Sequence, residues 1–488
     1  MKTRVLITSV LIVFISFLNF QYNLFSVVSD ERFEHFQVES SQFVLDGYLN
    51  HKLNDKDLKF GHFSRPSIDM FEGGEFYKPR EWYNDKFIEG EFWEYKSNYG
   101  LQLKIFDLFN GNLVLIQSLS SLLLSIVLAL IFIQMQTIHS YKFSLIFILV
   151  IIISPWITPI ARNVYFFIFS YFIPFLITLY FSDKIERSPR KLVIMLLLLY
   201  SIFLFKSLLG YDYVSVITLF SMVPLVHYYL KNNLSKLKLM RYLVLISFIS
   251  IMSFTTAIFM HYSTLDSEEN PARWIYLTAQ KRLSSSDPYK TAYETCYELF
   301  ASEDEIFNPD QKRNKDCIDE INESLSKSRL EVLARSFVAR HIIPFLGSNQ
   351  INLSNIQEED LKAIYYDENL NYFDKGIESL KYWNNNKEDL NSFEIFSELT
   401  NFIISPVIFI LIFILFFRRF LKMEFNEKLF SLIVISPPLS CFILLKGFSY
   451  VTIYTMTYFI WYIPTIPYLI AFLLTDTSIL QRDLKEIN

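Results

Sequence analysis

Three basic residues of this sequence stand alone at the ends of long apolar segments: Arg162, Lys206 and Lys446. An isolated charge at membrane depth is costly and usually has a partner. Because the three residues come from different segments, the fold can gather them. Three cations together suit an anion such as the phosphate of a membrane-embedded lipid. The alternative is that each cation reaches lipid headgroups or pairs with a nearby acid, as Lys206 can with Asp212.

Carboxylates follow the first apolar segment of the chain. Asp30 and Glu31 come soon after it, and Glu39 lies farther along, in Val-Glu-Ser-Ser-Gln-Phe-Val. If residues 31–46 are helical, Glu39 falls on or beside an apolar stripe, one turn before Phe43. Partial burial among aromatic rings would make this carboxylate a useful base. The alternative is that Glu39 belongs to an acidic face in contact with solvent.

Together, the cations and the carboxylates indicate a transfer reaction. An acceptor hydroxyl would attack a sugar carried on a lipid phosphate, and the carboxylate would take the hydroxyl proton. The cations would stabilise the charge that builds up on the departing phosphate. The sequence has no phosphate-binding loop of the Gly-x-x-x-x-Gly-Lys type, no dinucleotide-binding pattern, and neither His-Glu-x-x-His nor Cys-x-x-Cys. A monophosphate leaving group held by cations does not demand a metal, so we expect no metal and no cofactor.

The composition indicates which elements position these residues. Of 488 residues, 52% are apolar and 19% are charged, and the net charge is −5. The uncharged runs are roughly 20 residues long, which is the length that crosses a bilayer. This pattern excludes a soluble globular enzyme and a disordered chain, and the absence of alternation disfavours a membrane β-barrel. The negative charge argues against a nucleic-acid partner. We therefore expect an all-α polytopic membrane protein.

Ten segments are predicted to span the bilayer: 5–24, 113–135, 144–160, 163–181, 192–205, 211–230, 242–260, 401–417, 429–445 and 456–474. The first could instead be a cleaved signal peptide, since Lys2 and Arg4 precede it. No Ala occurs in the first 40 residues, so a small-residue cleavage site is missing, and we expect a retained span.

Basic residues predict the orientation. Outside the polar stretches 25–112 and 261–400 there are 20 Lys or Arg, and 17 of them lie at the termini or in every second short loop. The positive-inside rule places these 17 in the cytoplasm, together with both termini. The two long stretches, which hold 42 of the 50 acidic residues, are then extracytoplasmic.

The predicted organisation has six parts. They are a first transmembrane helix (1–24), an extracytoplasmic loop with the candidate carboxylates (25–112), a six-helix transmembrane region (113–260), a helical extracytoplasmic region (261–400), a three-helix transmembrane region (401–474) and a cytoplasmic tail (475–488). Residues 61–99 are expected to be irregular loop, because Gly and Pro interrupt them. Cys296 and Cys317 either pair in an oxidising compartment or remain free thiols.

Short motifs support a family resemblance. The carboxylate-bearing first outer loop, the Tyr-Gly-Leu-Gln stretch of residues 99–102 and the Ala-Arg-Asn-Val-Tyr stretch of residues 161–165 resemble multispan glycosyltransferases of the C-type superfamily. In size and layout the chain is similar to bacterial and phage-encoded serotype-converting glucosyltransferases that modify O-antigen, a lipopolysaccharide component. The resemblance implies a polyprenyl-phosphate sugar as donor, a lipid-linked or surface polysaccharide as acceptor, and a location in the cytoplasmic (inner) membrane.

The resemblance also implies roles for residues. The general base would be an acid of the first outer loop, at Glu39, although Asp30 and Glu31 match nearly as well and fit the paired acidic form of many relatives better. Substrate contacts are expected from Tyr99, Gln102 and Asn163, and a donor synthase and a flippase are expected partners. Two other functions stay open: a polysaccharide polymerase or ligase, and a non-enzymatic transporter or flippase of lipid-linked sugars.

Overall fold

The computed structural model describes residues 2–28, 33–34, 41–54, 63–66, 92–95, 98–136, 138–264, 309, 315, 318–319, 405–444, 455–463 and 465–475. Asp30, Glu31, Glu39 and Lys446 lie outside the described residues, as do Cys296, Cys317 and nearly all of the polar region 261–400.

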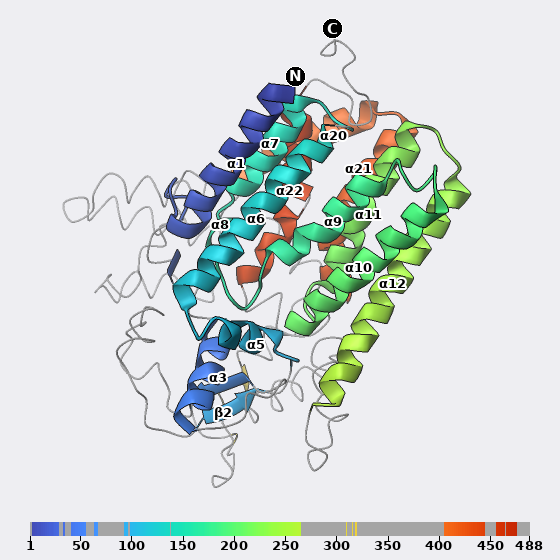
Figure 1. The fold of residues 1–488 in the computed structure, drawn as a ribbon. Helices are drawn as coiled ribbons and strands as arrows, with labels where there is room; N and C mark the ends of the chain where they lie inside the picture. Colours follow the sequence, from blue (N-terminus) through green and yellow to red (C-terminus); the bar gives the residue numbers. More distant parts are fainter. Residues whose placement is uncertain are drawn as a thin grey trace, which may run out of the picture.

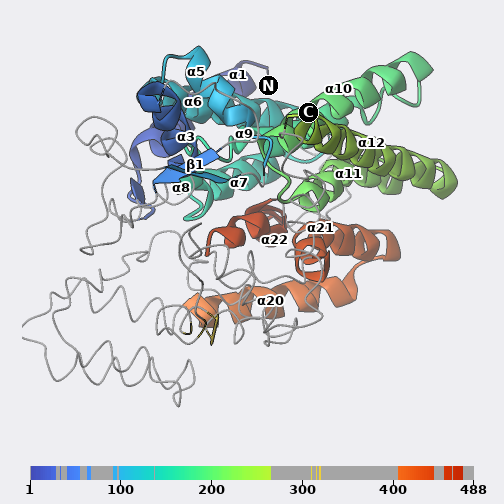
Figure 2. The same cartoon turned by 90° about the horizontal axis from the view of Figure 1, so that it is seen from below.

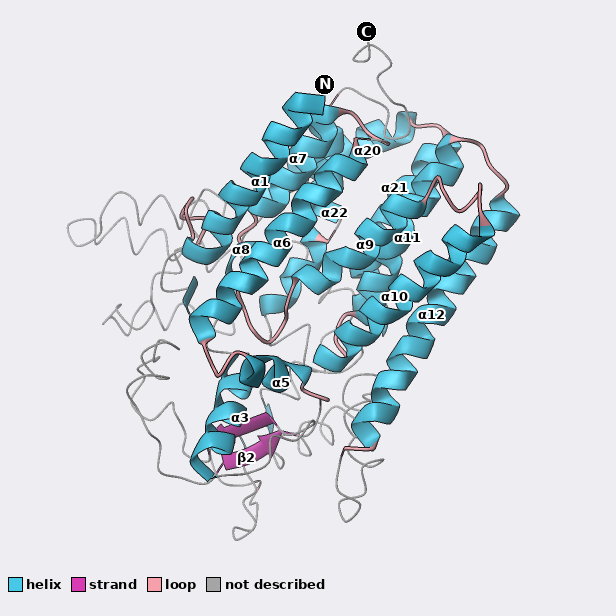
Figure 3. Ribbon diagram, viewed as in Figure 1, coloured by secondary structure: helices cyan, strands magenta, loops and turns pink. Residues whose placement is uncertain are grey.

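The described chain is helical apart from one small sheet (Figure 3). The N-terminal part has α1 (Lys2–Tyr22), α3 (Ser41–Asn54), α5 (Leu101–Leu108), α6 (Leu113–Met135), α7 (Tyr141–Ile152), α8 (Ile157–Ile160) and α9 (Phe169–Phe181). It continues with α10 (Pro189–Leu209), α11 (Val214–Lys231) and α12 (Lys236–Tyr262). The C-terminal part has α20 (Ser405–Lys422), α21 (Phe425–Leu444), the 3-10 helix η4 (Thr455–Tyr462) and α22 (Thr465–Leu474). The expected helical class is confirmed.

Five helices are long and apolar enough to cross a membrane: α1, α6, α10, α11 and α12. The other predicted spans overlap the shorter apolar helices α7, α9 and α22, and the helices α20 and α21. Of the predicted span 456–474, only the part from Thr465 onward is α-helix, and η4 precedes it. The structure thus supports a membrane protein, while the number of ten spans stays a prediction. Aromatic side chains fill much of the interior, and Phe175 stacks on Phe220 with ring centroids 4.3 Å apart.

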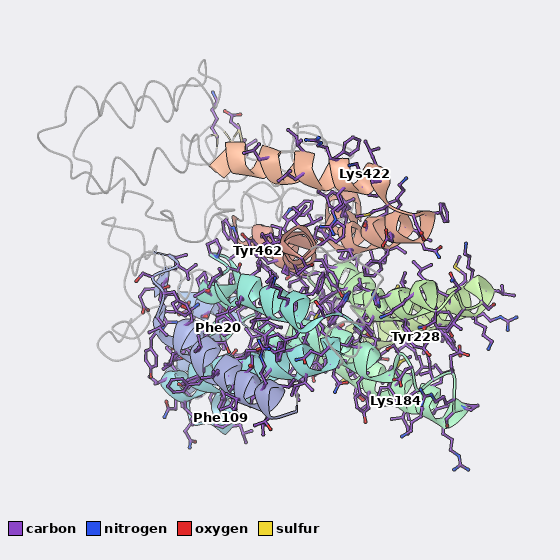
Figure 4. The ribbon with its side chains drawn as sticks, turned by 90° about the horizontal axis from the view of Figure 1, so that it is seen from above. Phe20, Phe109, Lys184, Tyr228, Lys422 and Tyr462 are labelled. Carbon is purple, nitrogen blue, oxygen red and sulfur yellow. The ribbon has the colours of Figure 1, made fainter. Side chains whose placement is uncertain are left out.

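The helices form two neighbouring groups. Helix α1 lies along α6; α9 packs on both α10 and α11, and α12 packs on the same two helices (Figure 1). Viewed along the bundle, α20, α21 and α22 form a separate layer, joined to the rest because α21 packs on α11 and α22 packs on α7 (Figure 2). The same layer is seen from the other end in Figure 4, where the labelled Lys184 and Lys422 lie on opposite sides of the bundle.

Two predicted spans, 144–160 and 163–181, are not continuous helices. Helix α7 ends at Ile152, and only the one-turn α8 interrupts irregular backbone before α9 begins at Phe169. Pro155 cannot continue a helix, and Ser154 Oγ accepts hydrogen bonds from the main-chain N–H groups of Trp156 (3.2 Å) and Ile157 (3.1 Å), which starts α8. Residues 154–172 are all buried, so protein covers this non-helical backbone.

A side chain from α1 donates a hydrogen bond to the main chain at the end of α7. Asn19 Nδ2 donates to the main-chain oxygen of Ile152 (2.7 Å) and to Thr158 Oγ1 (3.1 Å), and Thr158 Oγ1 also donates to Ile152 O (3.0 Å). A helix end without such partners would be costly in an apolar interior. The break is therefore held by a residue far away in the sequence.

In the first polar region, residues 33–34 are helical and α3 runs from Ser41 to Asn54, while residues 35–40 lie outside the described residues. A single helix over residues 31–46 therefore stays a prediction. Within the expected irregular loop, β1 (Phe63–Pro66) and β2 (Phe92–Tyr95) pair antiparallel, with Ser64 opposite Glu94. The prediction of loop at these strands was wrong because strand pairing over such a sequence distance leaves no local signal.

Candidate functional site at the α5 end of the bundle

The N-terminus of α1 lies at one end of the bundle, and α3, the sheet and α5 lie at the other (Figure 1). We call the latter the α5 end. Gly100 begins α5 with a φ of 74°, a left-handed conformation that glycine adopts without strain, and this turn places Gln102 in the first turn of the helix. The motif at residues 99–102 thus forms a sharp entry into α5.

Arg162 lies in the irregular backbone between α8 and α9 and is in contact with the chain that follows α1. Its Nη2 forms a 2.7 Å ion pair with Glu34 Oε1, and its Nη1 donates to the main-chain oxygen of Gln21 at 3.4 Å. The ring of Phe33 covers the guanidinium, with the Cζ atom 4.0 Å from the ring centroid. The arginine side chain is only 3% exposed, whereas that of Glu34 is 30% exposed.

Lys206 lies in the last turn of α10 and is 3% exposed. Its Nζ donates to the main-chain oxygens of Gly210 (2.8 Å) and Asp212 (3.2 Å) and lies 4.9 Å from the centre of the Tyr171 ring. A cation at a helix C-terminus is favourable because it balances the negative end of the helix dipole and binds carbonyls left without partners. The partner that the sequence suggested, Asp212, is thus in contact through its main chain.

Gln102 connects the segments that carry these two cations. Its Nε2 donates to the main-chain oxygen of Tyr165, three residues after Arg162, and to that of Leu209, three residues after Lys206. The two distances are 2.7 and 2.6 Å. The amide nitrogen of Gln102 therefore binds main-chain oxygens. Its amide oxygen, Oε1, is buried with no hydrogen-bond partner in the part of the chain that the structure describes.

The other two predicted contact residues, Asn163 and Tyr99, lie near this connection. Asn163 Oδ1 accepts from the main-chain N–H of Tyr165 at 2.9 Å, and Asn98 Nδ2 donates to the Tyr165 hydroxyl at 2.7 Å. Tyr99 packs edge-on against His261, 6.4 Å between ring centroids. Burial raises the pKa of the Tyr99 hydroxyl.

The fold therefore brings together the segments that carry Tyr99, Gln102, Asn163 and Lys206, and it places Arg162 beside an acid of the first polar region. That acid, Glu34, was not selected from the sequence. It lies in the same acidic stretch as Asp30 and Glu31, and nothing in its spacing distinguishes it from them. A shared anion site formed by Arg162 and Lys206 stays a prediction.

Another buried polar cluster lies between α7, α11 and α22. The rings of His139 and His227 are 4.4 Å apart, His139 stacks on Phe143 at 4.2 Å, and Tyr468 packs against both His139 and Phe143. Burial, with added repulsion from His227 and Lys231, holds the pKa of His139 well below its usual value. Among the described residues, no three His, Cys, Asp or Glu side chains come together as metal ligands would.

No protein-family model matches this chain, and neither the curated proteins nor the solved structures contain a match.

Proposed function

We propose that this protein is a membrane glycosyltransferase. It moves a sugar, with glucose as the expected one, from a polyprenyl-phosphate donor to a lipid-linked or surface polysaccharide such as O-antigen. The observation that carries the proposal is the position of Arg162. An arginine side chain that is only 3% exposed forms an ion pair with a carboxylate of the segment after the first helix. Burying a charge costs free energy unless an anion accompanies it, so such a site is suited to anions.

In the proposed reaction, Arg162, Lys206 and Lys446 bind the phosphate of the donor. A carboxylate of the first polar region, at Glu39, Asp30 or Glu31, accepts the proton of the acceptor hydroxyl as its oxygen bonds to the sugar. The sugar–phosphate bond breaks with its electron pair on the phosphate oxygen, where the cations stabilise it. No metal is needed for these steps.

Asn98 and Gln102 support a place for sugar hydroxyls. The Oδ1 of Asn98 and the Oε1 of Gln102 are buried and have no hydrogen-bond partner among the described residues, while their nitrogens are used within the protein. Buried acceptors of this kind gain from binding a hydroxyl donor. With Tyr99 and Asn163 nearby in the fold, they are the proposed substrate contacts.

The proposed setting follows from the charge pattern. Ten spans place both termini in the cytoplasm and both polar regions outside the cytoplasmic membrane, as in the C-type superfamily. A donor synthase would make the lipid-linked sugar in the cytoplasm, and a flippase would deliver it to the outer face.

The direct test is sugar transfer by purified protein supplied with a polyprenyl-phosphate hexose and a lipid-linked glycan, followed by the mass of the product. We expect one added hexose, and loss of transfer in Glu39→Gln, Asp30→Asn or Glu31→Gln. Glu186→Gln is the matched control, because Glu186 pairs with Lys238 (3.1 Å) outside the α5 end. Transfer retained in all three acid variants contradicts the proposed base, and altered glycan chain length supports a polymerase or ligase instead.

One observation favours a transporter as the second candidate. Transporters bind substrates at discontinuous helices, and the backbone between α7 and α9 is both broken and buried. Reconstituted protein that moves a labelled lipid-linked sugar across vesicles without transferring the sugar would establish this function.

A further inference from the structure

Arg162 is held from two sides by adjacent residues of one short segment. Glu34 binds Nη2 at 2.7 Å, and the ring of Phe33, itself 3% exposed, lies over the guanidinium. Glu34 thus occupies one edge of the guanidinium, and Phe33 covers its face. An anion that binds there has to displace both residues together, because they are neighbours in the chain.

The two partners of the ion pair differ in how firmly they are fixed. Arg162 is 3% exposed and bound to the main chain at Gln21, whereas Glu34 is 30% exposed. Removing the carboxylate partner of a buried arginine is strongly unfavourable. A carboxylate that is already partly in water loses much less when it leaves. The pair is therefore suited to exchange, with Arg162 staying in place and one anion replacing another.

We propose that Glu34 is a resident anion on Arg162 and that the phosphate of a polyprenyl-phosphate ligand displaces it. This inference rests on the proposed function, since it takes the lipid phosphate as the incoming anion. Glu34 then acts as a positioning residue: it keeps Arg162 paired and oriented until the phosphate binds. Displacement couples arrival of the phosphate to movement of the segment that carries Phe33, close in sequence to the candidate bases.

The test measures binding of farnesyl phosphate, a short polyprenyl monophosphate, to purified full-length protein. Glu34→Gln removes the competing charge, so we expect binding to tighten on the order of tenfold, as expected when a partly buried charge pair no longer has to be broken. In an Arg162→Gln background, the same Glu34→Gln change should alter binding by less than about twofold, because the two residues act as one unit. Glu186→Gln, which removes a paired carboxylate elsewhere, should leave binding unchanged.

Unchanged or weaker binding by Glu34→Gln overturns the inference, and so does equal tightening by Glu186→Gln, which would reflect net charge alone. If the variant does not fold, amide hydrogen exchange of the wild-type protein tests the inference instead. Displacement predicts faster exchange in the peptide containing Phe33 and Glu34 when farnesyl phosphate is added. Slower or unchanged exchange there contradicts displacement.

Further ligands separate this inference from the proposed function. Farnesol, which has no phosphate, should produce neither effect, and inorganic phosphate that binds as tightly as farnesyl phosphate would overturn the assignment to a lipid. If neither wild type nor Glu34→Gln binds farnesyl phosphate, both the proposed donor site and the proposed displacement of Glu34 are contradicted. Equal binding by both refutes only the exchange, whereas exchange without any sugar transfer refutes only the transferase.

Discussion

Gln102 and Leu209 are 107 positions apart in the chain and are joined by a 2.6 Å hydrogen bond from the glutamine amide to the leucine main-chain oxygen. The same nitrogen binds the main-chain oxygen of Tyr165. One side chain thus connects the backbone that follows Arg162 to the helix end that carries Lys206.

Replacing Gln102 by methionine should destabilise the protein by about 2 kcal/mol, because two buried carbonyls lose their donor. The measurement is the melting temperature in detergent. Gln136→Met is the control: the Nε2 of this glutamine has no hydrogen-bond partner in the described chain, so a change within about 0.5 kcal/mol is expected. Equal melting of the two variants would show that the connection contributes little.

Lys206→Met should affect both stability and ligand binding. Loss of two hydrogen bonds at the end of α10 should cost about 1–2 kcal/mol, and loss of the charge should weaken binding of farnesyl phosphate roughly tenfold. Lys231→Met is the matched control, because Lys231 also donates to a main-chain oxygen, that of Ile138, at 3.1 Å. We expect that control to lower stability alone. If Lys206→Met also changes stability alone, Lys206 is a helix cap and not a phosphate ligand.

Asn19→Leu should destabilise the protein by about 2–3 kcal/mol, because Ile152 O and Thr158 Oγ1 each lose the hydrogen bond from Asn19 in a water-poor interior. Thermal unfolding in detergent measures the loss. Ser9→Ala is the control, since Ser9 Oγ donates to Val5 O within its own helix at 2.8 Å and should matter much less. A loss for Asn19→Leu no larger than that for Ser9→Ala would mean that the break is stable by itself.

Acidification should destabilise the protein through His139. Its folded pKa lies below the ordinary value of 6.5, so under mildly acidic conditions the unfolded chain binds a proton that the folded protein does not. The stability that depends on neutral His139 is fully present above the unfolded pKa. It is lost as the pH falls from the unfolded pKa toward the folded pKa, by up to about 1.4 kcal/mol per pH unit. Melting temperatures at about pH 7.5 and about pH 5.5 measure the decline.

His139→Phe removes the titrating group and keeps an aromatic ring to stack on Phe143. The decline with pH should be smaller in this variant than in the wild type. An equal decline would assign the pH dependence to other groups.

Much of the helical layout is predictable because composition alone determines it. The predicted span 113–135 and α6 have the same bounds, and 5–24 and 211–230 differ from α1 and α11 by at most three residues at either end. A long apolar run has no other way to satisfy its backbone in a membrane. The breaks after Ile152 and before Phe169 were missed because a continuous apolar sequence masks them, and Asn19 stabilises the first from another helix.

The site was predictable only in outline. Arg162 and Lys206 are conspicuous as isolated charges, and the structure shows both buried with partners. Which acid meets Arg162 depends on how the chain turns after α1, and that turn decides between several carboxylates within a few residues. Gln102 was expected to bind substrate, and its main-chain role required knowing where Tyr165 and Leu209 lie in space.

The partners of Asn19 also set an order of events during synthesis. Ile152 and Thr158 follow it by 133 and 139 residues, so the ribosome has not yet made them when α1 enters the bilayer. Until both residues are made, the amide of Asn19 lacks the partners that it has in the folded protein. These hydrogen bonds can therefore form only after the turn beyond α7 has been synthesised.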